Sequence, residues 1–146
     1  MGLLSRLTKG VTPQKKVTDD VLLLHSMLLM AGADGVFDDE EIDAVRGYFG
    51  TLPEFKDKSF EELYQASLKL LKRYNNLAES VASLGDLSTQ NMKDKCFLIA
   101  VDIAMSTGDV DETEDAMLES MQRVLQVDDG TATKIIEVMN IKYAKA

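Results

Sequence analysis

Carboxylate side chains gather in two short windows of this 146-residue chain, and their type and spacing could hold a cation or cap a helix. Two carboxylates about 4 Å apart repel by roughly 1 kcal/mol in water and roughly 4 kcal/mol at a partly buried surface. Crowding of this kind needs something that offsets the repulsion. Twelve of the 25 acidic residues lie in the windows: Asp34, Asp38, Asp39, Glu40, Glu41 and Asp43, then Asp109, Asp111, Glu112, Glu114, Asp115 and Glu119.

Helix capping is the first explanation of the two windows. Asp38 with Glu41, and Asp111 with Glu114, have the spacing of a capping box, in which the first side chain accepts a hydrogen bond from the backbone three residues later. Carboxylates in a first helical turn also gain about 0.3–1 kcal/mol each from the helix dipole. On this interpretation the windows are helix starts with a solvated acidic face.

A bound divalent cation, Ca²⁺ or Mg²⁺, is the second explanation, because these ions prefer carboxylate oxygens. Asp34 favours it, since it follows a predicted helix end, where the dipole repels an anion. The site would not be an EF-hand: counted from Asp34, the sixth residue is Asp39 and the twelfth is Val45, where that loop has glycine and glutamate. The candidate ligands on this reasoning are Asp34, Asp38 and Glu41 at the first turn, and Asp109 and Asp111 at the second.

The elements that must position these residues are all helices. Capping signals, apolar spacing and glycine or proline stops predict an all-α bundle of about seven helices and no strands. A turn is expected at residues 128–130, before the last helix. The predicted helices are 18–31, 38–49, 60–74, 77–84, 89–107, 111–127 and 131–142.

An internal repeat relates the two acidic windows at an offset of 73 residues. Four positions are identical: Ala31 and Ala104, Gly35 and Gly108, Asp38 and Asp111, Glu41 and Glu114. Apolar positions of the flanking helices also coincide at this offset. The sequence therefore predicts two helix-turn-helix units that share a core, with the helices of residues 59–84 covering its open side. Thr107 stands where Asp34 stands in the first copy, which weakens the second turn as a cation site.

Charge divides the chain into a basic tail, residues 1–17, and a single acidic domain, residues 18–146. The net charge of −9 and pI of about 4.6 argue against nucleic acid as a partner, because phosphate binding needs clustered lysine and arginine. The tail has Leu3, Leu4 and Leu7 among its basic residues. Two interpretations stay open: peripheral association with an anionic membrane through residues 1–16, or a loose terminus.

No constellation for catalysis is found, and we expect a non-enzymatic protein. His25 is the single histidine and lies on an apolar helix, so a packed or half-exposed side chain is expected. Cys96 is the single cysteine, which excludes an intramolecular disulfide and suits a reducing cytoplasm. It is expected in the core. The sequence also has no glycine-rich phosphate loop.

Residues 31–41 (AGADGVFDDEE), recurring as residues 104–114 (AMSTGDVDETE), resemble the doubled motif of the TerB tellurite-resistance family over about residues 18–130. The resemblance implies a bacterial, cytoplasmic, all-helical stress-resistance module at the inner face of the membrane, with other stress-resistance proteins as partners. It also implies a cation site at Asp34, Asp38, Asp39 and Glu41, and a weaker one at Asp109, Asp111 and Glu114. The alternative function is a pure protein-interaction or scaffold domain with no metal site. Oligomeric state does not follow from the sequence.

Overall fold

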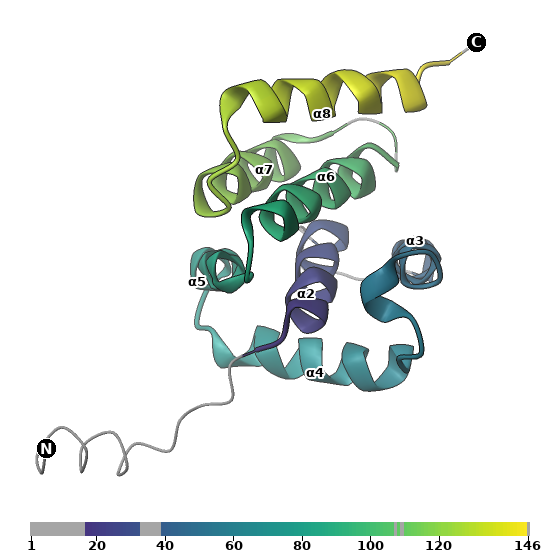
Figure 1. Cartoon of the computed structure of the whole chain (residues 1–146), viewed down its shortest axis with the longest axis vertical. Helices are drawn as coiled ribbons and strands as arrows, with labels where there is room; N and C mark the ends of the chain where they lie inside the picture. Colours follow the sequence, from purple (N-terminus) through teal and green to yellow (C-terminus); the bar gives the residue numbers. More distant parts are fainter. Residues whose placement is uncertain (1–16, 33–38, 107, 109, 146) are drawn as a thin grey trace, which may run out of the picture.

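The computed structural model describes residues 17–32, 39–106, 108 and 110–145, and in these residues it contains helices and no strand (Figure 1). The prediction of an all-α fold with about seven helices is confirmed. The predicted tail of residues 1–16 lies outside the described residues, so the boundary at residue 17 stays a prediction. The helices are α2 (Asp19–Ala31), α3 (Asp39–Phe49), η1 (Pro53–Phe55), α4 (Phe60–Arg73), α5 (Leu77–Ala82), η2 (Ser83–Asp86), α6 (Gln90–Ser106), α7 (Glu112–Val124) and α8 (Asp129–Lys142).

Polar side chains fix where several of these helices begin. Ser59 accepts a hydrogen bond from the Glu62 amide at 3.3 Å and starts α4 as predicted. The predicted turn at residues 128–130 is wrong. The Asp128 carboxylate accepts from the Thr131 amide at 2.7 Å, which makes Asp128 the N-cap and places residues 129 and 130 in the first turn of α8.

A Schellman motif ends α7 three residues earlier than predicted. Gln126 adopts a left-handed φ of +53°, and its amide donates to the Arg123 carbonyl. The Val127 amide donates to the Gln122 carbonyl at 3.1 Å. The helix therefore stops at Val124, and Val127 turns back into the core, where it is buried.

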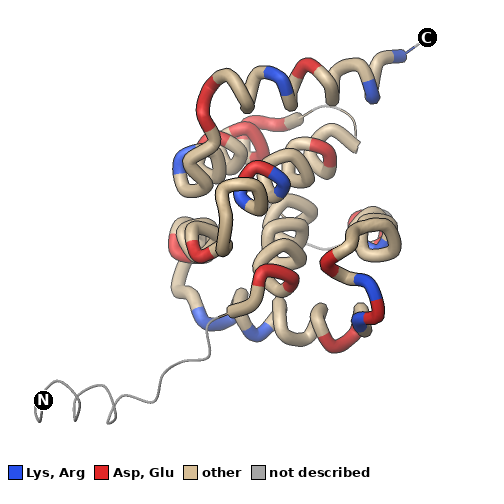
Figure 2. The backbone as a smooth tube through the Cα atoms, in the orientation of Figure 1, with Lys and Arg blue, Asp and Glu red and all other residues tan. Residues whose placement is uncertain are grey.

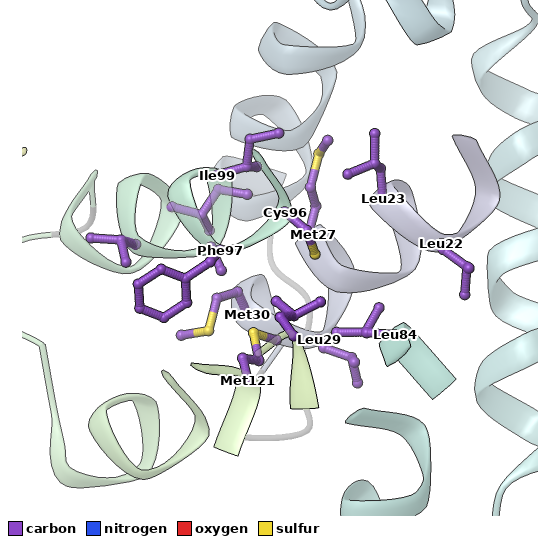
Figure 3. Packing of buried hydrophobic residues seen from close by; sticks show 14 of the residues in the cluster. Leu22, Leu23, Met27, Leu29, Met30, Leu84, Cys96, Phe97, Ile99 and Met121 are labelled. Carbon is purple, nitrogen blue, oxygen red and sulfur yellow. The ribbon is translucent and has the colours of Figure 1, made fainter. Parts of the chain in front are cut away.

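Helix α2 lies at the centre of the fold, and residues 22–30 are all buried. A helix that is apolar around its whole circumference needs neighbours on every side, and α2 contacts α3, α4, α6, η1 and η2. Figure 3 shows part of the resulting core, in which Met27 and Met30 of α2 lie close to Cys96 and Phe97 of α6. The hydrophobic cluster extends through α7 and α8, so the described helices share one core.

The packing of the first three long helices parallels that of the last three. Helix α2 packs on α3 and α4, α6 packs on α7 and α8, and α2 and α6 pack on each other. Of the helices predicted to cover the core, α4 lies on α2 and α5 lies on α7. The duplication itself stays a prediction, because the first of the two turns lies outside the described residues.

Candidate functional site

The first acidic turn connects the central helix to α3. The Gly32 amide donates to the Leu28 carbonyl at 2.9 Å and closes α2, and α3 begins seven residues later at Asp39. Asp39 is exposed and Glu41 is half-buried, both in the first turn of α3. The other two candidate ligands of this turn, Asp34 and Asp38, lie outside the described residues. The structure therefore places two of the four predicted ligands, Asp39 and Glu41, in one helical turn, and residues two apart on a helix do not face each other.

The second acidic turn contains the capping box that the sequence predicts. The Asp111 carboxylate accepts from the Glu114 amide at 2.7 Å, and the Glu114 carboxylate accepts from the Asp111 amide at 3.4 Å. Gly108 has a φ of +109°, a conformation that favours glycine. Asp109, the third candidate ligand, lies outside the described residues. Helix capping thus accounts for the positions of Asp111 and Glu114 without a cation.

Acidic residues mark helix starts throughout the described part of the chain. Helices α2, α4, α5, α7 and α8 all have Asp or Glu in the first turn, as the red segments of Figure 2 show. This distribution is the one that the helix dipole favours. Among the described residues, no group of three His, Cys, Asp or Glu side chains has the arrangement of a metal site. The cation prediction therefore depends on Asp34, Asp38 and Asp109 and stays a prediction.

A buried ionic cluster that sequence reasoning missed ties α8 to α6. Asp102 is only 3% exposed, and its carboxylate oxygens lie 2.8 and 3.0 Å from Lys142 Nζ. The Tyr143 hydroxyl donates to the same carboxylate. The hydrogen bond to Asp102 raises the pKa of Lys142, while burial, followed by the bond to Asp102, raises the pKa of Tyr143. The sequence feature that could have indicated this cluster is the acid Asp102 between Val101 and Ile103, inside an apolar helix.

A hollow of about 320 Å³ with a mixed polar and apolar lining opens beside this cluster, where α3 faces α6 and α8. Tyr48, Asp102, Ser106, Lys142 and Tyr143 contribute its polar groups. The Tyr48 hydroxyl is buried and has no hydrogen-bond partner among the described residues. The hollow therefore offers hydroxyl groups beside an ion pair, an environment suited to ordered water.

The single histidine and the single cysteine, the side chains best suited to act as a base or a nucleophile, both lie in the core. His25 is 0% exposed, and its Nε2 lies 3.2 Å from the Ser80 carbonyl oxygen, to which it donates. Burial lowers the pKa of His25, and the bond to Ser80 opposes this in part. Cys96 is also 0% exposed, and burial raises its pKa to about 12. The predictions of a packed histidine and a core cysteine are confirmed.

Residues 21–136 match the sequence model of a family described as "Tellurite resistance protein TerB". The match extends from the first turn of α2 into α8 and includes both acidic turns. A search of curated proteins and a search of solved structures each gave no match. In the described residues, no helix combines the length and the apolar character needed to cross a bilayer.

Proposed function

Because the chain belongs to the TerB family of tellurite resistance proteins, we propose that it is a non-enzymatic module of tellurite and stress resistance that binds a divalent cation. The ion is Ca²⁺ or Mg²⁺, and the first acidic turn binds it. The observation that carries this proposal is the short connection between α2 and α3: only seven residues separate Ala31 from Asp39, and they include Asp34 and Asp38.

The two helix ends that flank residues 32–38 support the assignment to the first turn. Asp34 follows the C-terminal end of α2, where the helix dipole disfavours an anion, and the chain then returns within a few residues to the acidic start of α3. A cation between Asp34, Asp38 and the carboxylates of Asp39 and Glu41 would offset both the dipole and the mutual repulsion.

The second turn is the weaker candidate. Its Asp111 and Glu114 carboxylates already cap α7, and Thr107 replaces the acid that precedes the glycine in the first turn. Asp109 remains as a further oxygen ligand there. We therefore expect one ion for each chain.

Thermal unfolding in the presence of metal tests this function. Ca²⁺ or Mg²⁺ should raise the Tm with increasing concentration, because a ligand at 100 times its Kd stabilises the folded state by about 2.7 kcal/mol. The double variant Asp34→Asn/Asp38→Asn should lose the shift. A matched control, Glu61→Gln/Glu137→Gln, removes two exposed charges from α4 and α8 and should keep it. A Tm that millimolar calcium, magnesium, manganese and zinc leave unchanged would overturn the proposal.

A scaffold domain without an ion is the second candidate, and the exposed apolar side chains of α8 favour it. Ile136, Val138 and Ile141 are 44%, 56% and 76% exposed, which is unusual for large apolar side chains on one helix. A photoreactive amino acid at position 141 should then crosslink a protein partner, whereas one at the exposed position 133 should not. Equal crosslinking from the two positions would count against an interaction surface on α8.

The cytoplasm is the compartment we propose, supported by the single reduced cysteine in the core. The acidic surface supports protein partners, among other stress-resistance proteins, rather than nucleic acid. The composition of residues 1–16 is compatible with three arrangements: association with the inner face of the membrane, a loose terminus, or contact with a surface of the same chain.

A further inference from the structure

An apolar groove of about 670 Å³ runs between α5 and α7, which lie side by side in Figure 1. Leu77 is 46% exposed at its edge, so the groove presents apolar surface to water. Apolar surface of this kind is stabilised when another segment covers it. The apolar lining consists of Leu77, Ala78 and Val81 from α5 and Ala116, Met117 and Val124 from α7.

The lining of the groove itself includes one carboxylate, Glu112, and one guanidinium, Arg123, while the elements around it are acidic overall. The three elements that form this side of the molecule, α5, η2 and α7, carry one arginine, Arg123, against six carboxylates. Figure 2 shows red segments on both α5 and α7. A segment that combines apolar and basic side chains would therefore complement the groove in both respects. The six acids are Glu79, Asp86, Glu112, Glu114, Asp115 and Glu119, of which Asp115 and Glu119 line a second hollow, on the side of α7 that faces α6 and α8.

Residues 1–16 of the same chain have this composition. Leu3, Leu4 and Leu7 follow the i, i+1, i+4 spacing that places side chains on one side of a helix. The segment contains no acid and has four basic residues: Arg6, Lys9, Lys15 and Lys16.

The described chain also begins close to the groove. The Asp19 carboxylate accepts from the Ser88 amide at 3.0 Å, which fixes the start of α2 beside the end of η2. Helix η2 follows α5 directly in the chain and contacts α7. Gly85 of η2 lies next to Val124 of α7, a residue that lines the groove: a Cβ atom on Gly85 would be 3.6 Å from Val124 Cγ1. Ten residues of extended chain span up to about 33–36 Å. Leu7 is therefore within reach of the groove from Val17.

We infer that residues 1–16 dock in the α5–α7 groove, with the leucines against its apolar lining and the basic residues near the acidic side chains of α5, η2 and α7. The docked segment covers apolar surface that is otherwise open, and its four basic residues reduce the net negative charge on this side of the molecule. This inference does not depend on the cation.

A disulfide in the full chain tests the docking. The variant Leu7→Cys/Ala116→Cys should form an intramolecular disulfide under mild oxidation, and the native Cys96 will not interfere, because it is buried with a pKa of about 12. The matched control Leu7→Cys/Glu137→Cys places the second thiol at an exposed position on α8. At micromolar protein in EDTA, we expect at least a tenfold faster closure for the first pair. Equal closure rates, or a disulfide-linked dimer as the main product, would overturn the inference.

Hydrogen exchange and vesicle flotation supply a second readout. In the variant Leu3→Ser/Leu4→Ser/Leu7→Ser, amides of α5 and of the first half of α7 should exchange several-fold faster than in the parent. The control Ser5→Ala/Thr8→Ala should exchange as the parent does. The parent should not float with vesicles that contain anionic lipid. Flotation that the leucine variant loses would assign residues 1–16 to the membrane and reject the docking.

Discussion

Lys142, the last residue of α8, forms an ion pair with Asp102 in the C-terminal third of α6, forty residues earlier in the chain. The two side chains differ in environment: that of Asp102 is 5% exposed and that of Lys142 is 52% exposed. A buried carboxylate is tolerated when it is paired and hydrogen-bonded, and here the positive charge reaches it from the surface. The Tyr143 hydroxyl completes the arrangement. The C-terminal end of α8 is thereby attached to the helix beneath it.

Replacing Lys142 should destabilise the protein because it leaves the Asp102 charge buried and less well compensated. We expect Lys142→Ala to lower the free energy of unfolding by about 1–3 kcal/mol, the usual cost of leaving a buried polar group without its partner. Urea unfolding measures this difference. Lys145→Ala, three residues on and exposed, is the control and should change stability by less than about 0.5 kcal/mol. Similar losses for the two variants would mean that the ion pair contributes nothing specific.

Acidification should destabilise the fold through His25. Burial lowers the pKa of this histidine in the folded state, whereas in the unfolded chain it titrates near 6.5. The unfolded state therefore binds more protons below that pH, and the free energy of unfolding should fall as pH decreases from 7 to 5, with a slope of up to about 1.4 kcal/mol per pH unit. The measurement is urea unfolding at several pH values. His25→Gln keeps a donor for the Ser80 carbonyl and should flatten the slope; an unchanged slope would assign the effect to other groups.

Removing the N-cap of α7 should cost about 1 kcal/mol. In Asp111→Ala the Glu114 amide loses its acceptor, while in Asp111→Asn the side-chain oxygen can still accept. We therefore expect Asp111→Ala to be destabilised and Asp111→Asn to stay near the parent in thermal unfolding. Glu112→Ala, an exposed acid in the same turn, controls for loss of charge. If Asp111→Asn is as unstable as Asp111→Ala, the charge rather than the cap supports this turn.

Local interactions explain which parts of the fold could be predicted. The caps at Ser59 and Asp111 involve residues three positions apart, so the sequence shows both partners at once. The start of α8 was missed for a local reason: Gly130 suggested a turn, whereas the Asp128 cap holds it in the first turn of the helix. The Asp102–Lys142 pair was missed for a different reason, since neither residue indicates its partner until two helices have packed.

The candidate site was predictable only as a set of residue types. The spacing of Asp111 and Glu114 specifies a capping box, and the structure contains it. The same two carboxylates could equally have been cation ligands, because the sequence does not say which way an acid turns. Asp34, Asp38 and Asp109 lie outside the described residues. The thermal unfolding experiment with added metal is therefore what decides between helix capping and cation binding at the first turn.

The complete burial of α2 has a consequence for how the protein is made. This helix leaves the ribosome early, yet one of the neighbours that covers it, α6, ends 75 residues later at Ser106. At about 5–20 residues per second, synthesis of that stretch takes roughly 4–15 seconds. Helices α3 and α4 are made within this interval and can cover part of α2, but the side chains that pack on α6 stay without their native partner until its end, so the nascent chain is a natural client for a chaperone that shields hydrophobic segments.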